Sequence, residues 1–389
     1  MKFNDLYYIN AMGQRLIKSH PDIKRDWKFF IYVIIMKLIT YSNVPVALYS
    51  LIAHDFESKD LGVIGPNAMT IVFYCAITLK YVIMMRHKKI FAAMINELDK
   101  DYVIAETWTI EERDIVIKYA NRAQYLVSAS FKMLVCAACL FPAMAGIFML
   151  HSKKLRYMWH ITFPEFLESI KFTPWVYAVM NFSSIITTIY IALVYFIFVP
   201  LAPIFILHSV GQLEVIIRRL GGVFSESKID NEDDVLRKLR EIAKHLEKVY
   251  TFVDNIQTTF LMYHEFILRI TVIMLSASGM IILEVTSYLI FLYIEYISVA
   301  FVSFAFVVFP CYYSDMLYQT SEKVRSAIYN CGWQFNYTRR SRILVLMLLQ
   351  RISRPMTITS FFKIVNLETL SDTLSQAYSI FNLFNAFWN

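Results

Sequence analysis

Charged side chains are scarce in this sequence: Asp, Glu, Lys and Arg together make up 18% of its 389 residues, against about 25% in a typical soluble domain. Glycine and proline are also rare, with 9 and 10 residues, which excludes collagen-like and low-complexity chains. Hydrophobic residues instead reach 57%. The apolar runs are long and unalternated, unlike the strands of a membrane β-barrel. The composition therefore predicts an all-α membrane protein.

Residue sets for catalysis, metal binding and disulfides are missing too. The eight histidines do not cluster with Asp or Glu at metal-ligand spacing, and no glycine-rich phosphate loop is present. None of the five cysteines falls in an expected outer loop, so no extracellular disulfide is expected. We therefore expect no enzyme activity, no metal and no cofactor. The net charge of +7 follows from the topology derived below, so no nucleic-acid partner is expected.

A transmembrane helix needs about 20 mainly apolar residues. We predict seven spans: Phe29–Ala53, Met69–Met85, Phe131–Leu150, Trp175–Leu207, Phe266–Leu283, Leu289–Phe309 and Thr373–Trp388. The apolar stretch Ile343–Leu349 is too short to span. We expect a break at Arg354-Pro355, which splits the last helix into this short inner piece and the seventh span.

The orientation follows from the basic residues, because cytoplasmic segments hold the excess of Lys and Arg. The N-terminal segment and the loops after the second, fourth and sixth spans carry 29 of them, whereas the opposite loops carry five. The sequence therefore predicts a cytoplasmic N-terminus and an extracellular C-terminus. A G-protein-coupled receptor has the opposite arrangement.

Residues 231–250 show apolar positions at helical spacing, with charged residues on the opposite face. This pattern predicts a cytoplasmic helix that continues directly into the fifth span. An apolar face held outside lipid needs protein partners, so we expect an inner bundle in which subunits pack against one another.

The outer halves of spans two to six are rich in aromatic residues and Met, with a few hydroxyls and amides. Such a lining suits a small apolar ligand held by shape and dispersion, although the same residues could merely pack helices. The candidate ligand-binding residues are Phe73, Tyr74, Met144, Phe148, Tyr177, Met180, Asn181, Ser184, Met280 and Tyr296.

The last helix carries a polar stripe at three- and four-residue steps, made of Ser375, Ser379, Asn382, Asn385 and Asn389. A one-sided stripe on a spanning helix either bonds to neighbouring helices or lines water, and both alternatives stay open. Glu368 and Asp372 lie one turn apart near its inner end. Repeated by symmetry in an oligomer, these carboxylates would favour cations; otherwise they form a surface pair.

The C-terminal third resembles the insect odorant receptor family. The residues that carry the resemblance cover about a fifth of the chain: Cys311-Tyr312-Tyr313, Ser321, Val324, Ala327, Tyr329, Trp333, Arg339-Arg340, Leu344, Leu346, Leu348, Arg354-Pro355, Thr359, Phe362, Asn366-Leu367-Glu368-Thr369-Leu370, Leu374 and Ala377-Tyr378-Ser379.

The resemblance implies a subunit of an odorant-gated, non-selective cation channel in the plasma membrane of olfactory sensory neurons. It implies three partners: the odorant receptor co-receptor in a heterotetramer, a small volatile odorant, and permeant cations. The last helix would line the pore, with the constriction near Tyr378, Phe381, Asn382 and Asn385. The inner bundle would anchor the subunits, through Tyr329, Trp333, Arg340, Leu344 and Leu348.

Six segments follow from this reading. They are a cytoplasmic N-terminal segment (1–28), spans one to four with the outer pocket (29–209), a cytoplasmic helical extension (210–262), spans five and six (263–314), a cytoplasmic anchor region (315–356) and the pore-lining helix (357–389).

Related channels differ from this chain in two places. The sister gustatory receptors usually have Thr before the Tyr of the pore motif and Gln six residues after it, where this chain has Ala377 and Phe384. The co-receptor has a much longer loop between spans four and five. The resemblance thus implies an odour-tuning subunit; the alternatives are a gustatory-type channel, a metabotropic seven-helix receptor and an apolar-substrate transporter.

The predicted topology can be checked with an epitope tag placed after Asn389. Antibody should stain the tag on intact, unpermeabilised cells, because the lopsided distribution of basic residues places the C-terminus outside. A tag before Met1 serves as the control and should need permeabilisation. Staining of the C-terminal tag only after permeabilisation would contradict the topology and favour the metabotropic alternative.

Overall fold

The computed structural model describes residues 2–58, 61–153, 155, 157, 163–224, 232–284, 290–334 and 338–388. The chain is mostly helical, since lipid offers no hydrogen-bond partner to a spanning backbone. Its short helices are α1 (Phe3–Leu6), α2 (Tyr8–Leu16), α4 (Val44–Ser50), the π-helix η1 (Leu51–Asp55), α5 (Phe56–Ser58), α9 (Glu165–Glu168) and α14 (Arg339–Arg351). Its longer helices are α3 (Trp27–Tyr41), α6 (Leu61–Arg86), α7 (Lys88–Ala105), α8 (Ile110–Ser152), α10 (Pro174–Phe198), α11 (Leu201–Val223), α12 (Glu232–Glu284), α13 (Ile290–Tyr329) and α15 (Leu367–Trp388).

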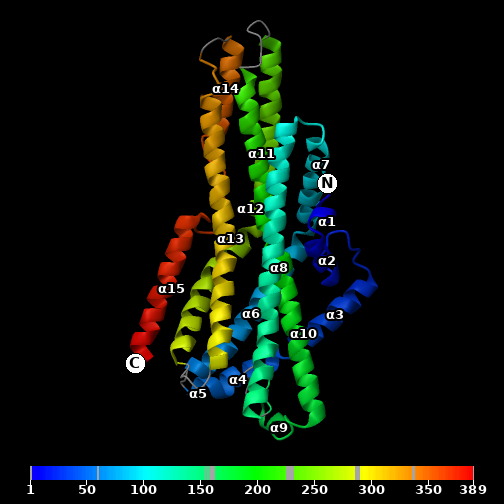
Figure 1. Cartoon of the computed structure of the whole chain (residues 1–389), viewed down its shortest axis with the longest axis vertical. Coiled ribbons are helices and arrows are strands. Elements are labelled where there is room, and N and C mark those ends of the chain that lie inside the picture. Colours follow the sequence, from blue (N-terminus) through cyan, green and yellow to red (C-terminus); the bar gives the residue numbers. More distant parts are fainter. Residues whose placement is uncertain are drawn as a thin grey trace.

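Three very long helices, α8, α12 and α13, set the elongated shape of the bundle (Figure 1). They contain 43, 53 and 40 residues, so α12 is about 80 Å long and far exceeds the hydrocarbon core of about 30 Å. Their upper parts project beyond the apolar layer together with α11 and α14, while α9 lies at the opposite end (Figure 1). The molecule therefore has a membrane half and a projecting half.

Six stretches of helix are long and apolar enough to cross a membrane: Trp27–Asp55, Ile64–Arg86, Ile110–His151, Pro174–Val223, Glu232–Leu283 and Tyr293–Tyr329. These contain the first five predicted spans and overlap the sixth, whose first residue, Leu289, lies outside the described residues. The seventh, α15, carries more polar residues and stands beside the membrane half of the bundle (Figure 1). The predicted all-α membrane fold is confirmed.

The predicted break at Arg354-Pro355 is also confirmed. Helix α14 ends at Arg351 and α15 begins at Leu367. Between them, an antiparallel bridge joins Thr359 to Ile364, and Gln257 of α12 both donates to and accepts from Thr359. From Glu232 onward, the predicted amphipathic stripe and the fifth span belong to a single helix, α12.

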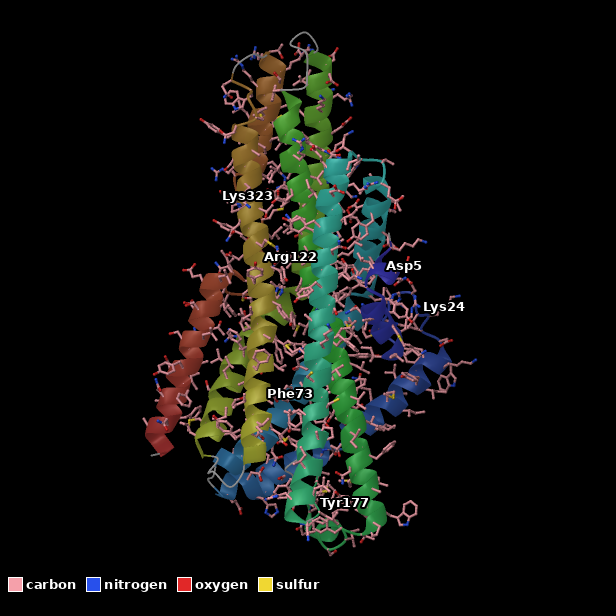
Figure 2. All side chains as sticks on the ribbon, in the orientation of Figure 1. Asp5, Lys24, Phe73, Arg122, Tyr177 and Lys323 are labelled. Carbon is pink, nitrogen blue, oxygen red and sulfur yellow. The ribbon has the colours of Figure 1, made fainter. Side chains whose placement is uncertain are left out.

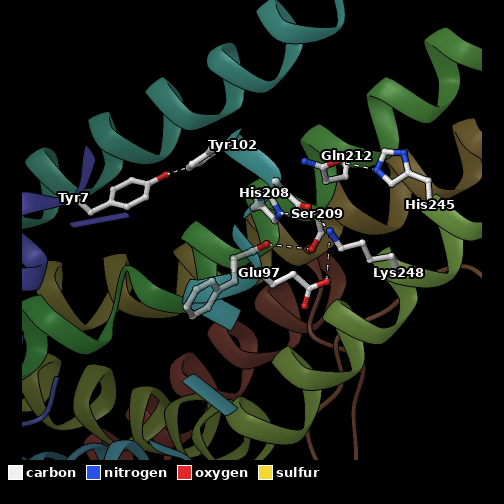
Figure 3. A network of polar contacts seen from close by, with 10 residues as sticks. Tyr7, Glu97, Tyr102, His208, Ser209, Gln212, His245 and Lys248 are labelled. Carbon is white, nitrogen blue, oxygen red and sulfur yellow. Dashed lines mark hydrogen bonds and ion pairs between the residues drawn. The ribbon is translucent and has the colours of Figure 1, made fainter. Parts of the chain in front are cut away.

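Buried polar side chains join α7 to the long bundle in the projecting half (Figure 3). Asp101 of α7 lies 3.1 Å from Nε2 of His208 of α11 and accepts a hydrogen bond from Nζ of Lys248 of α12. One turn earlier on α12, Nε2 of His245 lies 2.8 Å from Oε1 of Gln212 of α11. These contacts satisfy polar groups that would otherwise be buried without partners.

The same network reaches the N-terminal helices. Tyr102, next to Asp101, places its hydroxyl 3.4 Å from that of Tyr7, which lies between α1 and α2. Burial and the neighbouring Asp99 and Asp101 raise the pKa of Tyr102 to about 12, despite its hydrogen bond with Tyr7. The hydroxyl therefore stays protonated and available as a donor at neutral pH.

Asp101→Asn should destabilise the projecting half. Burial alone would raise the pKa of the Asp101 carboxyl, but His208 and Lys248 hold it below its usual value. The carboxylate thus stabilises the fold above the pKa it has in the unfolded chain, and this contribution is lost as pH falls through the lowered folded pKa. Because Lys248 still reaches solvent, we expect a loss of about 1–3 kcal/mol at neutral pH.

The measurement is the thermal unfolding midpoint of the purified protein in detergent, at pH 7 and near pH 3. The wild type and the variant should differ at pH 7, and the difference should be smaller at the lower pH. Glu241→Gln is the matched control, since its ion pair with Arg237 is exposed and such pairs contribute little. An unchanged midpoint for Asp101→Asn would contradict the structural role of the network.

Candidate functional site

A cavity of about 120 Å³ lies between four helices of the membrane half. Its walls come from α6, α8, α10 and α13. The lining residues are Phe73 of α6; Leu134, Ala137, Ala138 and Phe141 of α8; Thr188, Ile191, Ala192 and Tyr195 of α10; and Ser298, Val299, Val302 and Phe306 of α13.

Small residues opposite large rings create this space. Ala137, Ala138 and Ala192 present only methyl groups from α8 and α10. On the other side, the ring of Tyr195 stacks on Phe306 at 5.0 Å and meets Phe73 edge-on at 6.2 Å. Aromatic rings in such contacts hold each other in place, so the alanine side of the cavity is not filled by a rearranged ring.

The cavity wall has no charged side chain among its lining residues, and two of its hydroxyls are engaged within their own helices. Thr188 donates to the carbonyl of Ser184 at 3.0 Å, and Ser298 donates to the carbonyl of Glu295 at 2.7 Å. A site of this kind can hold a small apolar molecule by dispersion and shape. It has no group arranged for covalent chemistry.

Only Phe73, of the ten predicted ligand-binding residues, lines this cavity. Tyr296 packs just beside it, in an apolar cluster with Met69, Met274, Ile281 and Val299. Met280 is buried on α12. Tyr74, the neighbour of Phe73 on α6, faces away toward α3, where its ring lies 5.5 Å from that of Tyr41.

The remaining predicted residues lie nearer the end of the bundle formed by α9, where Figure 2 shows Tyr177 well below Phe73. The hydroxyl of Tyr177 donates to Sδ of Met149 at 3.0 Å, and its ring packs on Tyr157 at 5.2 Å. Ser184 donates to the carbonyl of Met180, and Asn181 to that of Tyr177. On α8, Met144 is buried and Phe148 half-buried. The structure does not bring this outer group into the cavity.

Sequence reasoning missed most of the cavity wall because it weighted aromatic and Met residues. The residues that leave the space open are alanines, and their signal was the small-residue run from Cys136 to Cys139 on α8. Within that run, Ala137 and Ala138 form one wall of the cavity.

Helix α15 packs on α12 along one face only. The hydroxyl of Ser276 donates to the carbonyl of Ala377 at 2.8 Å, and the ring of Phe381 lies against Gly279. Thr369, Thr373 and Ala377 are buried on this side.

The opposite side of α15 carries the predicted polar stripe and Tyr378, whereas Phe381, another predicted pore residue, packs on α12. Ser375, Ser379 and Asn382 are exposed, as is Tyr378; Asn385 is half-buried, and Asn389 lies outside the described residues. Both carboxylates near the start of the helix are exposed, and Asp372 pairs with Nζ of Lys363 at 3.0 Å. The stripe therefore faces away from its own subunit.

The predicted anchor residues are divided between the two surfaces of the projecting half. Tyr329 and Arg340 are exposed, and the indole of Trp333 donates to the carbonyl of Tyr329 at 3.0 Å. Leu348 is buried within the subunit and Leu344 half-buried. The exposed apolar side chains of α14 are Ile343, Leu346 and Met347. Among the described residues, no group of His, Cys, Asp and Glu could hold a metal ion.

Comparison with known proteins identifies a matching family and solved structures with a similar fold. A family model described as 7tm Odorant receptor matches residues 60–378. Two solved structures of the insect olfactory receptor OR5 from Machilis hrabei are similar to this chain. The structure in complex with eugenol has a TM-score of 0.78 at 12% identity, covering 99% of this chain and 98% of that one. The other has a TM-score of 0.71 at 13% identity, with 97% of both chains covered. No curated protein sequence matches.

Proposed function

Because the chain belongs to the 7tm odorant receptor family, we propose that it is the odour-tuning subunit of an odorant-gated, non-selective cation channel. The observation that carries this proposal is the apolar cavity between α6, α8, α10 and α13. An apolar cavity of about 150 Å³ in another protein binds benzene, so a cavity of about 120 Å³ suits a volatile molecule of about the size of benzene, with roughly six heavy atoms. The olfactory receptor OR5 of Machilis hrabei was solved in complex with eugenol.

Helix α15 is proposed to line the pore. Its polar stripe points away from α12, and four such helices around an axis would give a water-filled channel. Glu368, with no ion pair among the described residues, would attract cations to the inner mouth, whereas Asp372 is partly neutralised by Lys363. The other subunits of the heterotetramer would be copies of the odorant receptor co-receptor, as the family resemblance implies.

The topology supports this arrangement. The N-terminal segment, marked by Asp5 and Lys24, lies toward the projecting half marked by Lys323, and Tyr177 lies at the opposite end (Figure 2). Together with the excess of basic residues in these segments, this supports a cytoplasmic projecting half and an extracellular C-terminus. The site of action is then the plasma membrane of olfactory sensory neurons.

A continuous path of contacts connects the cavity to α15. Phe73 and Val299 belong both to the cavity wall and to the apolar cluster around Tyr296. That cluster includes Met274 and Ile281 of α12, the helix on which α15 rests. An odorant that binds the open arrangement better than the closed one would shift the population toward open channels. A small ligand has only a few kcal/mol of differential affinity, so the two arrangements must be close in energy.

Filling the cavity with a larger side chain should weaken odorant binding. Ala138→Phe places a ring in the space between α8 and α13, and the half-maximal odorant concentration should rise at least about tenfold, because the ligand and the new ring compete for the same volume. The measurement is odour-evoked current in cells that express the receptor with the co-receptor. Ala143→Phe, on an exposed position of the same helix, is the control. Equal odorant sensitivity in both variants would count against this cavity as the binding site.

The contact between α12 and α15 should affect opening whichever odorant is used. In Gly279→Ala the new Cβ would lie 3.0 Å from the ring of Phe381, so this ring of α15 must give way. We expect the half-maximal concentrations of all active odorants to change by the same factor, because the closed–open balance changes and the cavity does not. Gly146→Ala is the matched control, since no atom lies within 4 Å of its added Cβ. An odorant-specific change would contradict this role.

A further inference from the structure

One hydroxyl in the cavity wall has no hydrogen-bond partner among the residues that the structure describes. Tyr195 of α10 is 5% exposed and lines the cavity, and its hydroxyl makes no hydrogen bond with any residue that the structure describes. A buried Tyr hydroxyl normally finds a partner, because leaving it unpaired is unfavourable. The neighbouring space that could hold such a partner is the cavity itself.

The other two hydroxyls of the wall cannot donate to a ligand without breaking a bond. Each hydroxyl has a single hydrogen, and those of Thr188 and Ser298 are directed to carbonyls of their own helices. Tyr195 is therefore the available hydrogen-bond donor among the lining side chains.

Lys80 of α6 holds and polarises this tyrosine. Its Nζ lies 3.6 Å from the centre of the Tyr195 ring and has no hydrogen-bond partner among the described residues. Phe306 stacks on the same ring at 5.0 Å. The Lys80 ammonium and the Phe306 ring are both too close to lie on the same face of the Tyr195 ring, so the Tyr195 ring is packed between them. An ammonium over an aromatic face is attracted to its electrons, and by withdrawing electron density it makes the phenol a stronger donor.

We propose that Tyr195 recognises the odorant by donating its hydroxyl hydrogen to an acceptor oxygen, and that Lys80 is its positioning residue. The ligand class is a small, mainly apolar molecule with one carbonyl or ether oxygen. A ketone satisfies the buried hydroxyl, whereas a hydrocarbon of the same shape leaves it unpaired. This inference rests on the proposed function of the cavity as the odorant site.

The test uses cyclohexanone and methylenecyclohexane, which have nearly the same shape and differ in one acceptor oxygen. The readout is the ratio of their half-maximal concentrations in cells that express the receptor with the co-receptor, with surface expression matched by staining. The wild type should favour the ketone by about fivefold. Tyr195→Phe removes the hydroxyl and retains the ring, so its ratio should fall to about one.

Two further variants separate recognition from packing. Tyr190→Phe makes the same chemical change on the same helix, at a ring that faces Lys37 and does not line the cavity; it should retain the wild-type ratio. Lys80→Met keeps the length of the side chain without its charge and should give an intermediate ratio, while Lys80→Arg should restore the preference. If Lys80→Met kept the wild-type ratio of half-maximal concentrations, Lys80 would not be a positioning residue for Tyr195.

Thermal unfolding of the purified receptor with each ligand separates failure of this inference from failure of the channel proposal. A larger stabilisation by cyclohexanone in the wild type, lost in Tyr195→Phe, supports the inference even if neither ligand evokes a current. Currents of equal sensitivity to both ligands would overturn the inference and leave the channel function standing. Retention of the ketone preference in Tyr195→Phe would overturn it as well.

Discussion

The burial of the first thirteen residues of α11 on all sides is the constraint on which the rest of the molecule depends. Every residue from Leu201 to Leu213 is buried, and α8, α12 and α13 surround this helix. Gly211 allows close approach, since a Cβ there would lie 3.3 Å from Cβ of Tyr119 on α8. His208 of α11 pairs with Asp101 of α7, and the side-chain oxygen of Gln212 pairs with His245 of α12. The three surrounding helices continue into the membrane half, so their packing in the projecting half also sets their separation around the cavity.

The cavity is a place where this close packing is interrupted. Protein interiors are normally filled, and a void forfeits the dispersion contacts of its lining. Here alanines on α8 and α10 leave the space, while Tyr195, fixed between Lys80 and Phe306, maintains it. A bound odorant would recover the missing contacts. The unfilled space lowers the packing energy of the bundle. For the same reason, a small ligand that fills it would stabilise the bundle.

Helix α15 is held differently from the rest of the bundle. It contacts its subunit along one face, through α12 and α13 (Figure 1), and its other face combines polar and aromatic side chains that lie exposed in the single chain. A helix attached on one side can move without disturbing the core around α11. This asymmetry fits the proposed moving pore element, in which other subunits would cover the exposed face.

Hydropathy, charge and helical spacing were enough to predict the spans, the continuity of α12 and the break at Arg354-Pro355. Each of these features depends on the length and polarity of a local segment. The position of the cavity did not follow from them. A spanning helix such as α6 is apolar on every side, so its sequence does not distinguish the face toward lipid from the face toward its neighbours. For this reason the sequence predicts Phe73 and Tyr74, which are adjacent aromatic residues, in one pocket. In the structure their side chains point to different helices. Which faces meet depends on the tilt and rotation of helices far apart in the chain, and these follow from packing around α11.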